Sequence, residues 1–409
     1  MAGDENIRCE IAIIGGGIVG SAVAMALGER GVAATVIDVD LSGRLSSSER
    51  NAGGVRATWW NPVNIALCRK SIEYYEKIRA EIGLRQTGYL VLYDERRWAA
   101  AMSKLAMQRE LGQEIEQLTA PQVQSRVPEI DRLDGIAAAT FSPHDGLLNP
   151  NLLKEHYRTR SRENARPAQY LDRTCVYGVE AGTGEVRLFC WQDQSRFSDE
   201  ELLRMMSQDE AGEAEPGSVF EVTAQRVVVA AGAWAANILQ LAGLKNYTIP
   251  VRRQICIVDN RQTNLDRCGM IFDTSGLYCH NEGAHILAGY SPPEEPSGYS
   301  FKYDGEEFFE HEIWPRLYAR MSCMERLHHI TGWAGLYAVT PDRSAIVGRA
   351  SERLYDCHSF TGHGVMQSYG AAQAIADLIV KGSYGTFDAS GLERQRFETG
   401  RWVYEELHY

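Results

Sequence analysis

Apolar and polar positions near the start of the chain predict a strand, a helix and a second strand in close succession. Glu10–Ile14 is an apolar, β-branched run, and apolar residues then recur at spacings of three and four from Val19 to Leu27. The helical pattern stops before Gly31, and Ala34–Ile37 forms a second apolar run. A helical period between two short β-branched runs is typical of a βαβ unit with parallel strands.

The middle of the chain alternates between helical and strand patterns. Asn61-Pro62 supplies an N-cap residue and a first-turn proline, which predicts a helix start, and Gly83 is suited to end that helix. The pattern then predicts a strand at Gly88–Tyr93, a helix near Arg96–Leu111, a strand at Ile136–Phe141, a helix from about Asn151 and two or three short strands within Ala168–Trp191.

The last part of the chain predicts a second sheet and then a return to the first. Val219–Ala231 ends as a fully apolar strand with a glycine turn, which favours a place in the sheet of the βαβ unit. Alternating strands over Tyr247–Tyr290 predict a largely antiparallel sheet. The remaining predicted elements are an amphipathic helix at Phe308–Met321 kinked at Pro315, strands at Ala345–Gly348 and Leu354–Phe360, and a helix at Gly364–Val380.

These elements predict an α/β protein with two domains. A Rossmann-like dinucleotide-binding domain is expected in three separate pieces, residues 1–85, 146–245 and 331–409. A second, substrate-type domain of α+β architecture with a mostly antiparallel sheet is expected from residues 86–145 and 246–330. The first domain is therefore discontinuous in sequence.

Composition and charge narrow the partners. The chain has 409 residues, 44% of them hydrophobic, and a formal net charge of -12, which disfavours nucleic acid and anionic membranes as partners. No apolar run reaches the roughly 18–20 residues that a membrane span needs. The first residues, MAGDENIR, are acidic and polar, so we expect a cytoplasmic protein. Nine scattered cysteines without a CxxC pair predict reduced, buried thiols and no metal site.

An acidic insertion interrupts the strand pattern at residues 195–217. It contains seven acidic residues and two arginines. Such a charge run predicts a solvated, mobile segment, and a protein-docking role through this insertion is the alternative.

Glycines follow the first predicted strand with the spacing of a dinucleotide fingerprint. Gly15 allows a tight turn, Gly17 leaves room for a pyrophosphate, and Gly20 lets the helix pack closely on the strand. The helix N-terminus offers N–H groups and a positive dipole end to the phosphates, and Asp38 can accept hydrogen bonds from a ribose. An ordinary glycine-rich turn is the alternative, but the flanking strand, helix and acid favour a nucleotide site.

Four stretches together resemble the FAD-dependent oxidoreductases of the D-amino acid oxidase family, which includes glycine oxidase, sarcosine oxidase and dimethylglycine dehydrogenase. They are Ile11–Asp38, Ser46–Arg56, Val227–Trp234 and Gly332–Gly370, and the last contains GWAGLYAVTPDRSAIVG and SFTGHGVMQSYG. The chain is also similar to a mitochondrial branch of FAD-dependent oxidoreductase-domain proteins that assist assembly of respiratory complex I. The resemblance implies FAD as cofactor.

The resemblance also implies which residues hold FAD. They run from the pyrophosphate turn through the polar loop to the flavin end, where a helix starting at Gly364 would face the flavin. The implied set is Gly15, Gly17, Ile18, Val19, Gly20, Asp38, Val39, Ser47, Ser48, Asn51, Ala52, Gly53, Gly54, Val176, Ala231, Gly232, Trp234, Gly335, Gly362, His363, Gly364, Val365, Met366 and Gln367. A tight strand end is the alternative for positions 231 and 232, and a helix-capping turn histidine is the alternative for position 363.

Five residues are catalytic candidates by the same resemblance: Arg56, Tyr278, His280, Tyr337 and His363. A surface loop arginine is the alternative at position 56. Trp59 and Trp60 either wall the site or pack in the core.

The departures from the family pattern are informative. Gly335 and Asn51 stand where some relatives attach the flavin covalently, so we expect non-covalent FAD. Tyr337 and His280 stand where relatives carry the arginine that binds the substrate carboxylate, and Arg252 or Arg253 is the candidate substitute.

The implied reaction is hydride transfer to flavin N5 from a C–H beside an amine nitrogen, which gives an imine. The expected substrate is a small amine or an (N-methyl) amino acid such as sarcosine or glycine, with oxygen or a carrier as electron acceptor. An FAD-binding assembly or interaction protein with little turnover is one alternative. Another flavoenzyme on the same fold, such as a hydroxy-acid oxidase, is the other, because fold alone does not decide function.

Overall fold

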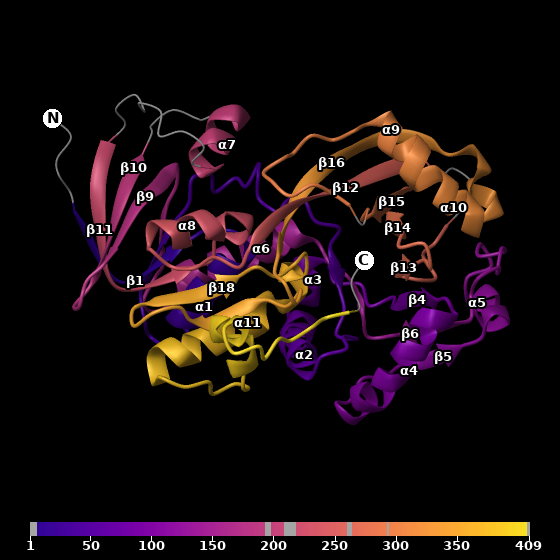
Figure 1. Ribbon diagram of the computed structural model, residues 1–409, viewed down its shortest axis with the longest axis horizontal. Helices are drawn as coiled ribbons and strands as arrows, with labels where there is room; N and C mark the ends of the chain where they lie inside the picture. Colours follow the sequence, from indigo (N-terminus) through magenta and orange to yellow (C-terminus); the bar gives the residue numbers. More distant parts are fainter. Residues whose placement is uncertain (1–5, 193–197, 208–217, 260–263, 293, 407–409) are drawn as a thin grey trace.

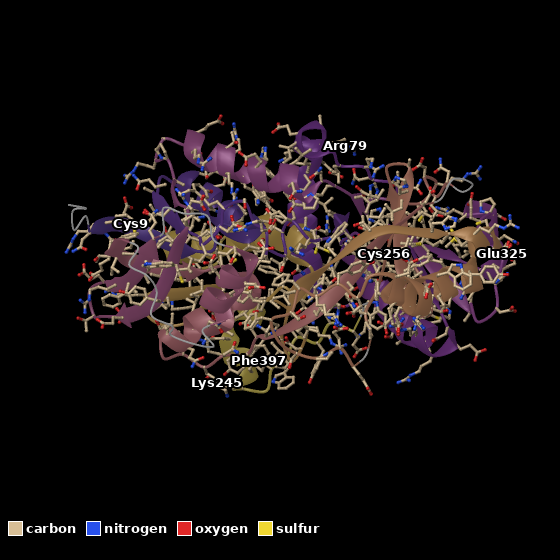
Figure 2. All side chains as sticks on the ribbon, turned by 90° about the horizontal axis from the view of Figure 1, so that it is seen from above. Cys9, Arg79, Lys245, Cys256, Glu325 and Phe397 are labelled. Atoms are coloured by element: carbon tan, nitrogen blue, oxygen red, sulfur yellow. The ribbon has the colours of Figure 1, made fainter. Side chains whose placement is uncertain are left out.

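The computed structural model describes residues 6–192, 198–207, 218–259, 264–292 and 294–406, and two large β-sheets lie side by side along its length (Figure 1). Figure 2, which turns the molecule by 90°, places Cys9 of the first sheet and Glu325 beside the second sheet at opposite ends. Among the described residues, no helix combines the length and the apolar character that crossing a membrane requires.

The first sheet has eight strands, with the order β17-β18-β11-β1-β2-β8 and with β10 and β9 continuing from β11. β1 is parallel to β2 and to β11, and β11 is parallel to β18. The predicted return of the late strands to the first sheet is therefore confirmed. The strands are β1 (Ile7–Ile14), β2 (Ala34–Ile37), β8 (Gln169–Leu171), β9 (Thr174–Ala181), β10 (Val186–Gln192), β11 (Ser218–Val229), β17 (Ile346–Arg349) and β18 (Leu354–His358).

Helices from both ends of the chain pack together beside the first sheet. α1 contacts α6 and α11, and α11 contacts α2. The Asn61 side chain accepts the Val63 amide and caps α2, as the sequence predicts. These helices are α1 (Ile18–Gly28), α2 (Pro62–Lys77), α3 (Arg79–Ile82), α6 (Pro150–Glu163) and α11 (Gly364–Lys381), and η1 (Gly232–Trp234) and α8 (Ala235–Leu241) follow β11.

Close approach of α1 to β1 depends on a missing side chain. A Cβ at Gly20 would lie 1.8 Å from the carbonyl oxygen of Gly15 and 3.4 Å from the Ala230 Cβ. Gly15 itself has φ of +107°, a backbone conformation that side chains other than glycine's rarely tolerate. The turn and the helix position are thus fixed by glycines at both places.

The second sheet has eight strands in the order β16-β12-β15-β14-β13-β4-β6-β5. Its neighbours are antiparallel except for the parallel pair β13 and β4, which confirms the predicted largely antiparallel sheet. The strands are β4 (Tyr89–Tyr93), β5 (Glu116–Leu118), β6 (Ala138–Ser142), β12 (Ile249–Asp259), β13 (Met270–Phe272), β14 (Tyr278–Glu282), β15 (His285–Tyr290) and β16 (His328–Val339).

Alternation along these strands gives the second sheet two different faces. One face, with Leu90, Cys256 and Cys279, packs against Phe308 and Ile313 of the covering helical segment. The other face carries Tyr89, Ile255, Met270, Phe272 and Tyr278 in a separate cluster. Successive side chains of a strand point to opposite faces, so neighbouring residues lie on different faces of this sheet.

The covering segment is helical but irregular. It comprises α9 (Glu306–Phe308), a π-helical turn (Phe309–Ile313) and α10 (Trp314–Arg320), followed by η3 (Ser322–Arg326). Pro315 lies in the first turn of α10, where a missing N–H costs no helical hydrogen bond. The predicted irregularity near Pro315 therefore takes the form of a π-helical turn before the proline.

Shorter elements complete the fold. Buried ion pairs anchor the C-terminal segment: Arg394 Nε lies 2.6 Å from Asp356 Oδ2 of β18, and Arg396 Nε lies 2.6 Å from Asp342 Oδ2 in the connection between β16 and β17. The elements not yet named are β3 (Gly54–Val55), which pairs with β7 (Gly146–Leu147), α4 (Glu95–Glu110), α5 (Ala120–Arg126), η4 (Ser390–Leu392) and η5 (Arg394–Phe397).

Three details correct or refine the sequence predictions. The acidic insertion contains a helix, α7 (Asp199–Ser207), so residues 198–207 are not the solvated loop that its charge predicts, while 195–197 and 208–217 lie outside the described residues. The predicted domain boundary at residue 330 falls inside β16. All nine cysteines are free; six are buried, Cys9 and Cys175 are half-buried, and Cys323 is exposed.

Replacing Gly20 by alanine tests the close packing of α1. A Cβ 1.8 Å from a backbone oxygen cannot be accommodated by moving a side chain, so we expect the free energy of unfolding to fall by about 3 kcal/mol. Urea unfolding of Gly20→Ala against Gly184→Ala measures this, because a Cβ at Gly184 has nothing within 4 Å. Equal stability of the two variants would contradict the packing argument.

Candidate functional site

A long cavity lies between the two sheets, and segments from both ends of the chain line it. The β1–α1 turn, the loop after β2, the start of β9 and the turn before α11 contribute from the first sheet, and β12, β13, β14 and β16 contribute from the second. The sequence-predicted residues along the cavity are Gly15, Gly17, Ile18, Val19, Asp38, Val39, Ser47, Ser48, Asn51, Ala52, Gly53, Gly54, Arg56, Val176, Ala231, Gly232, Trp234, Tyr278, Gly335, Tyr337, Gly362, His363, Gly364, Val365 and Met366.

Asp38 marks one end of the cavity. Its Oδ2 accepts the Gly16 amide at 2.5 Å and its Oδ1 accepts the Asp40 amide at 2.8 Å. Burial raises the pKa of Asp38, while these amide hydrogen bonds oppose the rise. The carboxylate is therefore fixed beside the glycine turn, at the position where the fingerprint places an adenosine ribose.

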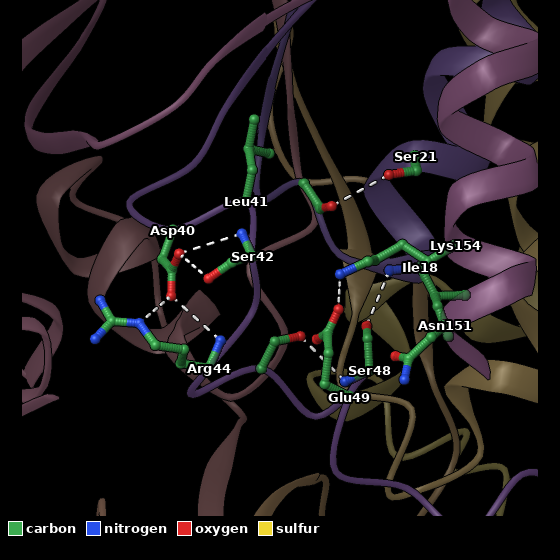
Figure 3. A network of polar contacts seen from close by, with 12 residues as sticks. Ile18, Ser21, Asp40, Leu41, Ser42, Arg44, Ser48, Glu49, Asn151 and Lys154 are labelled. Carbon is green, nitrogen blue, oxygen red and sulfur yellow. Dashed lines mark hydrogen bonds and ion pairs between the residues drawn. The ribbon is translucent and has the colours of Figure 1, made fainter. Parts of the chain in front are cut away.

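The polar loop after β2 is organised by its own side chains (Figure 3). Ser48 Oγ accepts the Ile18 amide at the start of α1 at 3.0 Å, and Arg44 Nε pairs with Asp40 Oδ2 at 3.0 Å. Glu49 forms an ion pair with Lys154 of α6 in the same view. The loop is thus tied both to the N-terminus of α1 and to a helix behind it.

Glycines make the cavity wall a backbone surface, which is the test of fit for a dinucleotide. A Cβ at Gly17 would lie 3.0 Å from Ser48 Oγ, and a Cβ at Gly364, the first residue of α11, would have no atom nearer than 3.7 Å. At Gly232, with φ of +55°, no atom lies within 4 Å of the Cβ position. Bare backbone beside the N-termini of α1 and α11 suits a group with phosphates and a flat ring system, so the residues fit FAD.

The turn before α11 forms the opposite end of the cavity. α11 begins at Gly364, and its N-cap residue His363 makes no side-chain cap hydrogen bond. The His363 ring instead packs edge-on against Trp59, with ring centroids 4.2 Å apart. The His363 side chain therefore does not cap α11 by a hydrogen bond, as the alternative interpretation requires.

Arg56 is buried beside this turn. Arg56 is only 2% exposed. Its guanidinium lies 3.7 Å from the Trp59 ring centroid and 5.7 Å from the Phe272 ring centroid. The surface-loop alternative for Arg56 is therefore wrong. Cation–π contact with Trp59 holds the charge in place at the cavity wall.

A buried carboxylate supports the Arg56 loop from behind. Asp145 Oδ1 accepts the Ala57 amide at 2.8 Å, and Asp145 Oδ2 accepts the Thr58 hydroxyl at 2.9 Å. Burial raises the pKa of Asp145 to about 6, although these hydrogen bonds and the Arg56 charge lower it. With a pKa of about 6, Asp145 changes its charge near neutral pH, and it is hydrogen-bonded to the residues that directly follow Arg56.

Aromatic side chains and a second arginine close the same end. Burial raises the pKa of Tyr278 and of Tyr337, so both phenols are neutral hydrogen-bonding groups, and the Arg253 charge opposes the rise in each. The Arg253 guanidinium lies 5.5 Å from the Tyr337 ring centroid. Arg253 Nη1 donates to the Arg252 carbonyl at 2.9 Å, whereas its buried Nε makes no hydrogen bond.

Three predicted site residues do not line the cavity. His280 lies on the same strand face as Tyr278, but its Nδ1 and Nε2 lie 2.7 and 3.1 Å from the carbonyl oxygens of Asn281 and Ala52. It therefore fastens the loop at Ala52 to β14 and is not a catalytic group facing the cavity. Gly20 serves helix packing, and the Gln367 side chain is buried away from the cavity.

The two tryptophans are core residues. Trp59 is fully buried and supports Arg56 and His363 from outside the cavity, and Trp60 packs with Tyr89. Neither lines the cavity.

Sequence reasoning missed several cavity-lining residues. Arg50 follows the serines of the polar loop, and its Nη1 donates to the Ala334 carbonyl at 2.8 Å. Tyr89 and Phe272 are strand residues on the cavity face of the second sheet. Alternation along a strand identifies them as cavity residues only when it is known which face the helical segment covers. Leu202 and Met206 come from α7, and the Ser198-x-x-Glu201 capping pattern before an apolar pair was the available signal.

The described residues contain no group of three histidine, cysteine, aspartate or glutamate side chains placed to hold a metal ion.

Comparison with known families and proteins agrees with this geometry. The sequence model of the family described as "DAO: FAD dependent oxidoreductase" matches residues 10–378. The chain is 27% identical to FAD-dependent oxidoreductase domain-containing protein 1 of Xenopus laevis, over 98% of the chain and 84% of that protein. It is 24% identical to mitochondrial dimethylglycine dehydrogenase of Rattus norvegicus, over 97% of the chain and 45% of that protein.

Solved structures share the fold. L-proline dehydrogenase from P. horikoshii superimposes with a TM-score of 0.81 at 25% identity, covering 97% of this chain and 99% of that one. Glycine oxidase from Geobacillus kaustophilus superimposes with a TM-score of 0.76 at 20% identity, covering 95% of this chain and 98% of that one.

Asp145→Asn tests the buried carboxylate through the pH dependence of stability. The pKa of Asp145 is about 6 in the folded protein and about 3.9 in an unfolded chain, so its contribution to stability is present below about pH 4 and is lost as pH rises through 6. Each pKa unit corresponds to about 1.4 kcal/mol, which makes the loss about 3 kcal/mol.

Urea unfolding at pH 4 and at pH 7 measures this difference. Between about pH 4 and about pH 7 the wild type is expected to lose about 2–3 kcal/mol more of its free energy of unfolding than Asp145→Asn does, because asparagine does not ionise. Parallel pH profiles for the two proteins would show that Asp145 is not the titrating group.

Proposed function

Because the chain belongs to the DAO family of FAD-dependent oxidoreductases, we propose that it oxidises the C–N bond of a small amino acid or N-methyl amino acid, such as sarcosine or glycine. The observation that carries the proposal is a pair of cavity-lining arginines, the buried Arg56 and the half-buried Arg253, in an aromatic end of the cavity that faces the turn before α11. Positive charge inside apolar walls favours a small anion with an apolar body.

Arg253 is the group proposed to bind the substrate carboxylate. Its Nε is buried without a hydrogen-bond partner, and a buried polar group without a partner favours a ligand that supplies one. Arg252, the other candidate, is on the opposite strand face, where its Nε pairs with Glu295 Oε1 at 2.5 Å and its Nη2 with Asp304 Oδ2 at 3.0 Å. A guanidinium suits a carboxylate because it donates two parallel hydrogen bonds.

The aromatic residues around Arg253 would position the rest of the substrate. Tyr337 packs on Gly362, and Tyr89, Phe272 and Tyr278 form the opposing wall. Apolar walls exclude water and favour the neutral amine over the ammonium form, because burying an unpaired charge is costly. Only the neutral amine has the lone pair that helps a hydride to leave the neighbouring carbon.

FAD, when bound, supplies the acceptor for the hydride and its two electrons. The substrate amine becomes an imine, and water then hydrolyses the imine to a carbonyl compound and an amine or ammonia. Arg56 and the first-turn N–H groups of α11 would stabilise the negative charge that develops at this end of the cavity. His363, packed on Trp59, would add a further donor.

The cofactor is proposed to be held without a covalent bond. Gly335 has no side chain, and the Asn51 side chain is used within its own loop, donating to the Ser48 carbonyl at 2.7 Å and accepting the Gly53 amide at 2.7 Å.

Anaerobic mixing of the FAD-loaded protein with candidate substrates tests the reaction class. We expect sarcosine, glycine, proline or a D-amino acid to bleach the flavin absorbance, and amines without a carboxylate and 2-hydroxy acids to leave it unchanged. Bleaching by 2-hydroxy acids alone would contradict the C–N assignment. Absence of bleaching by the whole panel would favour the alternative of an FAD-binding interaction protein with little turnover.

Arg253→Met tests the carboxylate contact with the substrate found in that panel. Loss of a charged hydrogen bond of about 1.5–3 kcal/mol is expected to raise the half-saturating substrate concentration by about 10- to 150-fold. Arg252→Met is the matched control, since it removes an arginine one position away on the other strand face. Equal effects of the two substitutions would exclude Arg253 as the carboxylate-binding group.

Arg56→Met tests the charge beside the turn before α11. Methionine keeps an extended side chain over Trp59 but removes the positive charge, so FAD is expected to stay bound while its reduction by substrate slows by about tenfold or more. Stopped-flow absorbance under anaerobic conditions measures the rate. Unchanged reduction kinetics would remove Arg56 from the site.

A further inference from the structure

Helix α7 gives the acidic insertion a defined structure next to the cavity. The Ser198 Oγ accepts the Glu201 amide at 3.2 Å, and the Glu201 carboxylate accepts the Ser198 amide at 2.6 Å. This reciprocal pair is a capping box, and acidic residues in the first turn favour the helix dipole. The helix start is therefore specified locally, within a segment whose composition alone predicts a solvated loop.

One face of α7 is apolar and turned toward the cavity. Leu202 is fully buried, in a cluster with Leu45, Val39 and Phe301. Met206 follows one helical turn later on the same face and belongs to the same cluster. Both residues line the cavity.

Polar contacts hold α7 across the cavity from one side to the other. Asp199 Oδ1 pairs with Arg44 Nη1 at 2.8 Å, and Arg44 pairs with Asp40, two residues after Asp38. On the other side, Asn237 of α8 donates from its side chain to the Met206 carbonyl. The helix thus bridges the loop after β2 and the helix after β11, which are the two first-sheet segments that bound this part of the cavity.

We propose that α7 is the outer wall of the adenosine half of the FAD site, with Met206 against the adenosine and Leu202 anchoring the helix beside Leu45, and that it controls how fast FAD is released. Val39 directly follows Asp38, so the cluster that contains Leu202 lies at the ribose-binding end of the cavity. The thioether of Met206 suits the flat face of an adenine ring. Val39 and Leu45 of the same cluster also line the cavity, so α7 adds to the apolar contact at this end.

The role of α7 holds whatever the substrate is, because it concerns cofactor retention. For FAD to leave past α7, the Arg44–Asp199 pair and the Leu202 contacts have to open. The pair is partly exposed, with Asp199 59% exposed, so salt screens it. FAD release should therefore accelerate with ionic strength.

The experiment follows FAD release from the loaded protein after dilution, by the fluorescence that free FAD regains. The double substitution Leu202→Ala with Met206→Ala is expected to raise the release rate by about tenfold or more, because it removes the Met206 contact with the ligand and the Leu202 packing that anchors α7. Glu200→Ala is the matched control on the exposed face of the same helix, and its rate is expected to stay within about twofold of the wild type. Equal release rates for the wild type and the double variant would overturn the proposal, as would equal acceleration by Glu200→Ala.

Asp199→Asn gives a second measurement that does not depend on core packing. The wild-type release rate is expected to rise between low and high salt, and the rate for Asp199→Asn is expected to be high already at low salt and to change little. The same salt dependence in both proteins would contradict control of FAD release by α7. Circular dichroism on each variant confirms that the fold is retained.

Discussion

The structure depends on bringing backbone N–H groups, without intervening side chains, to the place where a dinucleotide's negative charge must sit. Gly20 allows α1 to approach the Gly15 carbonyl closely, and at Gly364, the first residue of α11, no atom lies nearer than 3.7 Å to the Cβ position. The two helices start at Ile18 and Gly364, and they pack against each other. A charged phosphate leaves water only where such fixed donors replace its hydration. The long separation in sequence is bridged by parallel pairing of β1, β11 and β18.

The cavity divides its chemistry between its two ends. The Asp38 end is acidic, with Asp38 and Asp40 fixed by amides and Arg44, whereas the opposite end holds Arg56 and Arg253 among aromatic rings. Asp145 links stability to this second end, because it anchors the residues that directly follow Arg56. The face alternation of β12 then separates Arg253, at the cavity, from Arg252, which is paired with Glu295 on the other face.

Local patterns predicted the elements that form the nucleotide part, because Gly15, Gly17 and Gly20 and the adjoining apolar periods report on nearby backbone. Local patterns do not show which second-sheet residues reach the cavity. His280 and Tyr278 share a strand face, but His280 is two residues further along β14 and contacts the Ala52 carbonyl, whereas Tyr278 lines the cavity. Arg253 could not be chosen over Arg252 until the covered face was known. The α7 helix was missed because net charge dominated the interpretation, although the Ser198–Glu201 capping box and the Leu202–Met206 spacing were present. The domain limits and the roles of the cavity residues remain predictions.

A crystal structure of the FAD-loaded protein tests the central claim most directly, which is that both ends of the chain bind one dinucleotide in a fixed direction. The account predicts the adenosine ribose on Asp38, the pyrophosphate at the start of α1, and the flavin beside Tyr337 at the first turn of α11, with no covalent bond to the chain. A dinucleotide in the reverse direction, a flavin placed outside the Arg56–Arg253 end, or a covalent bond to a side chain would contradict it.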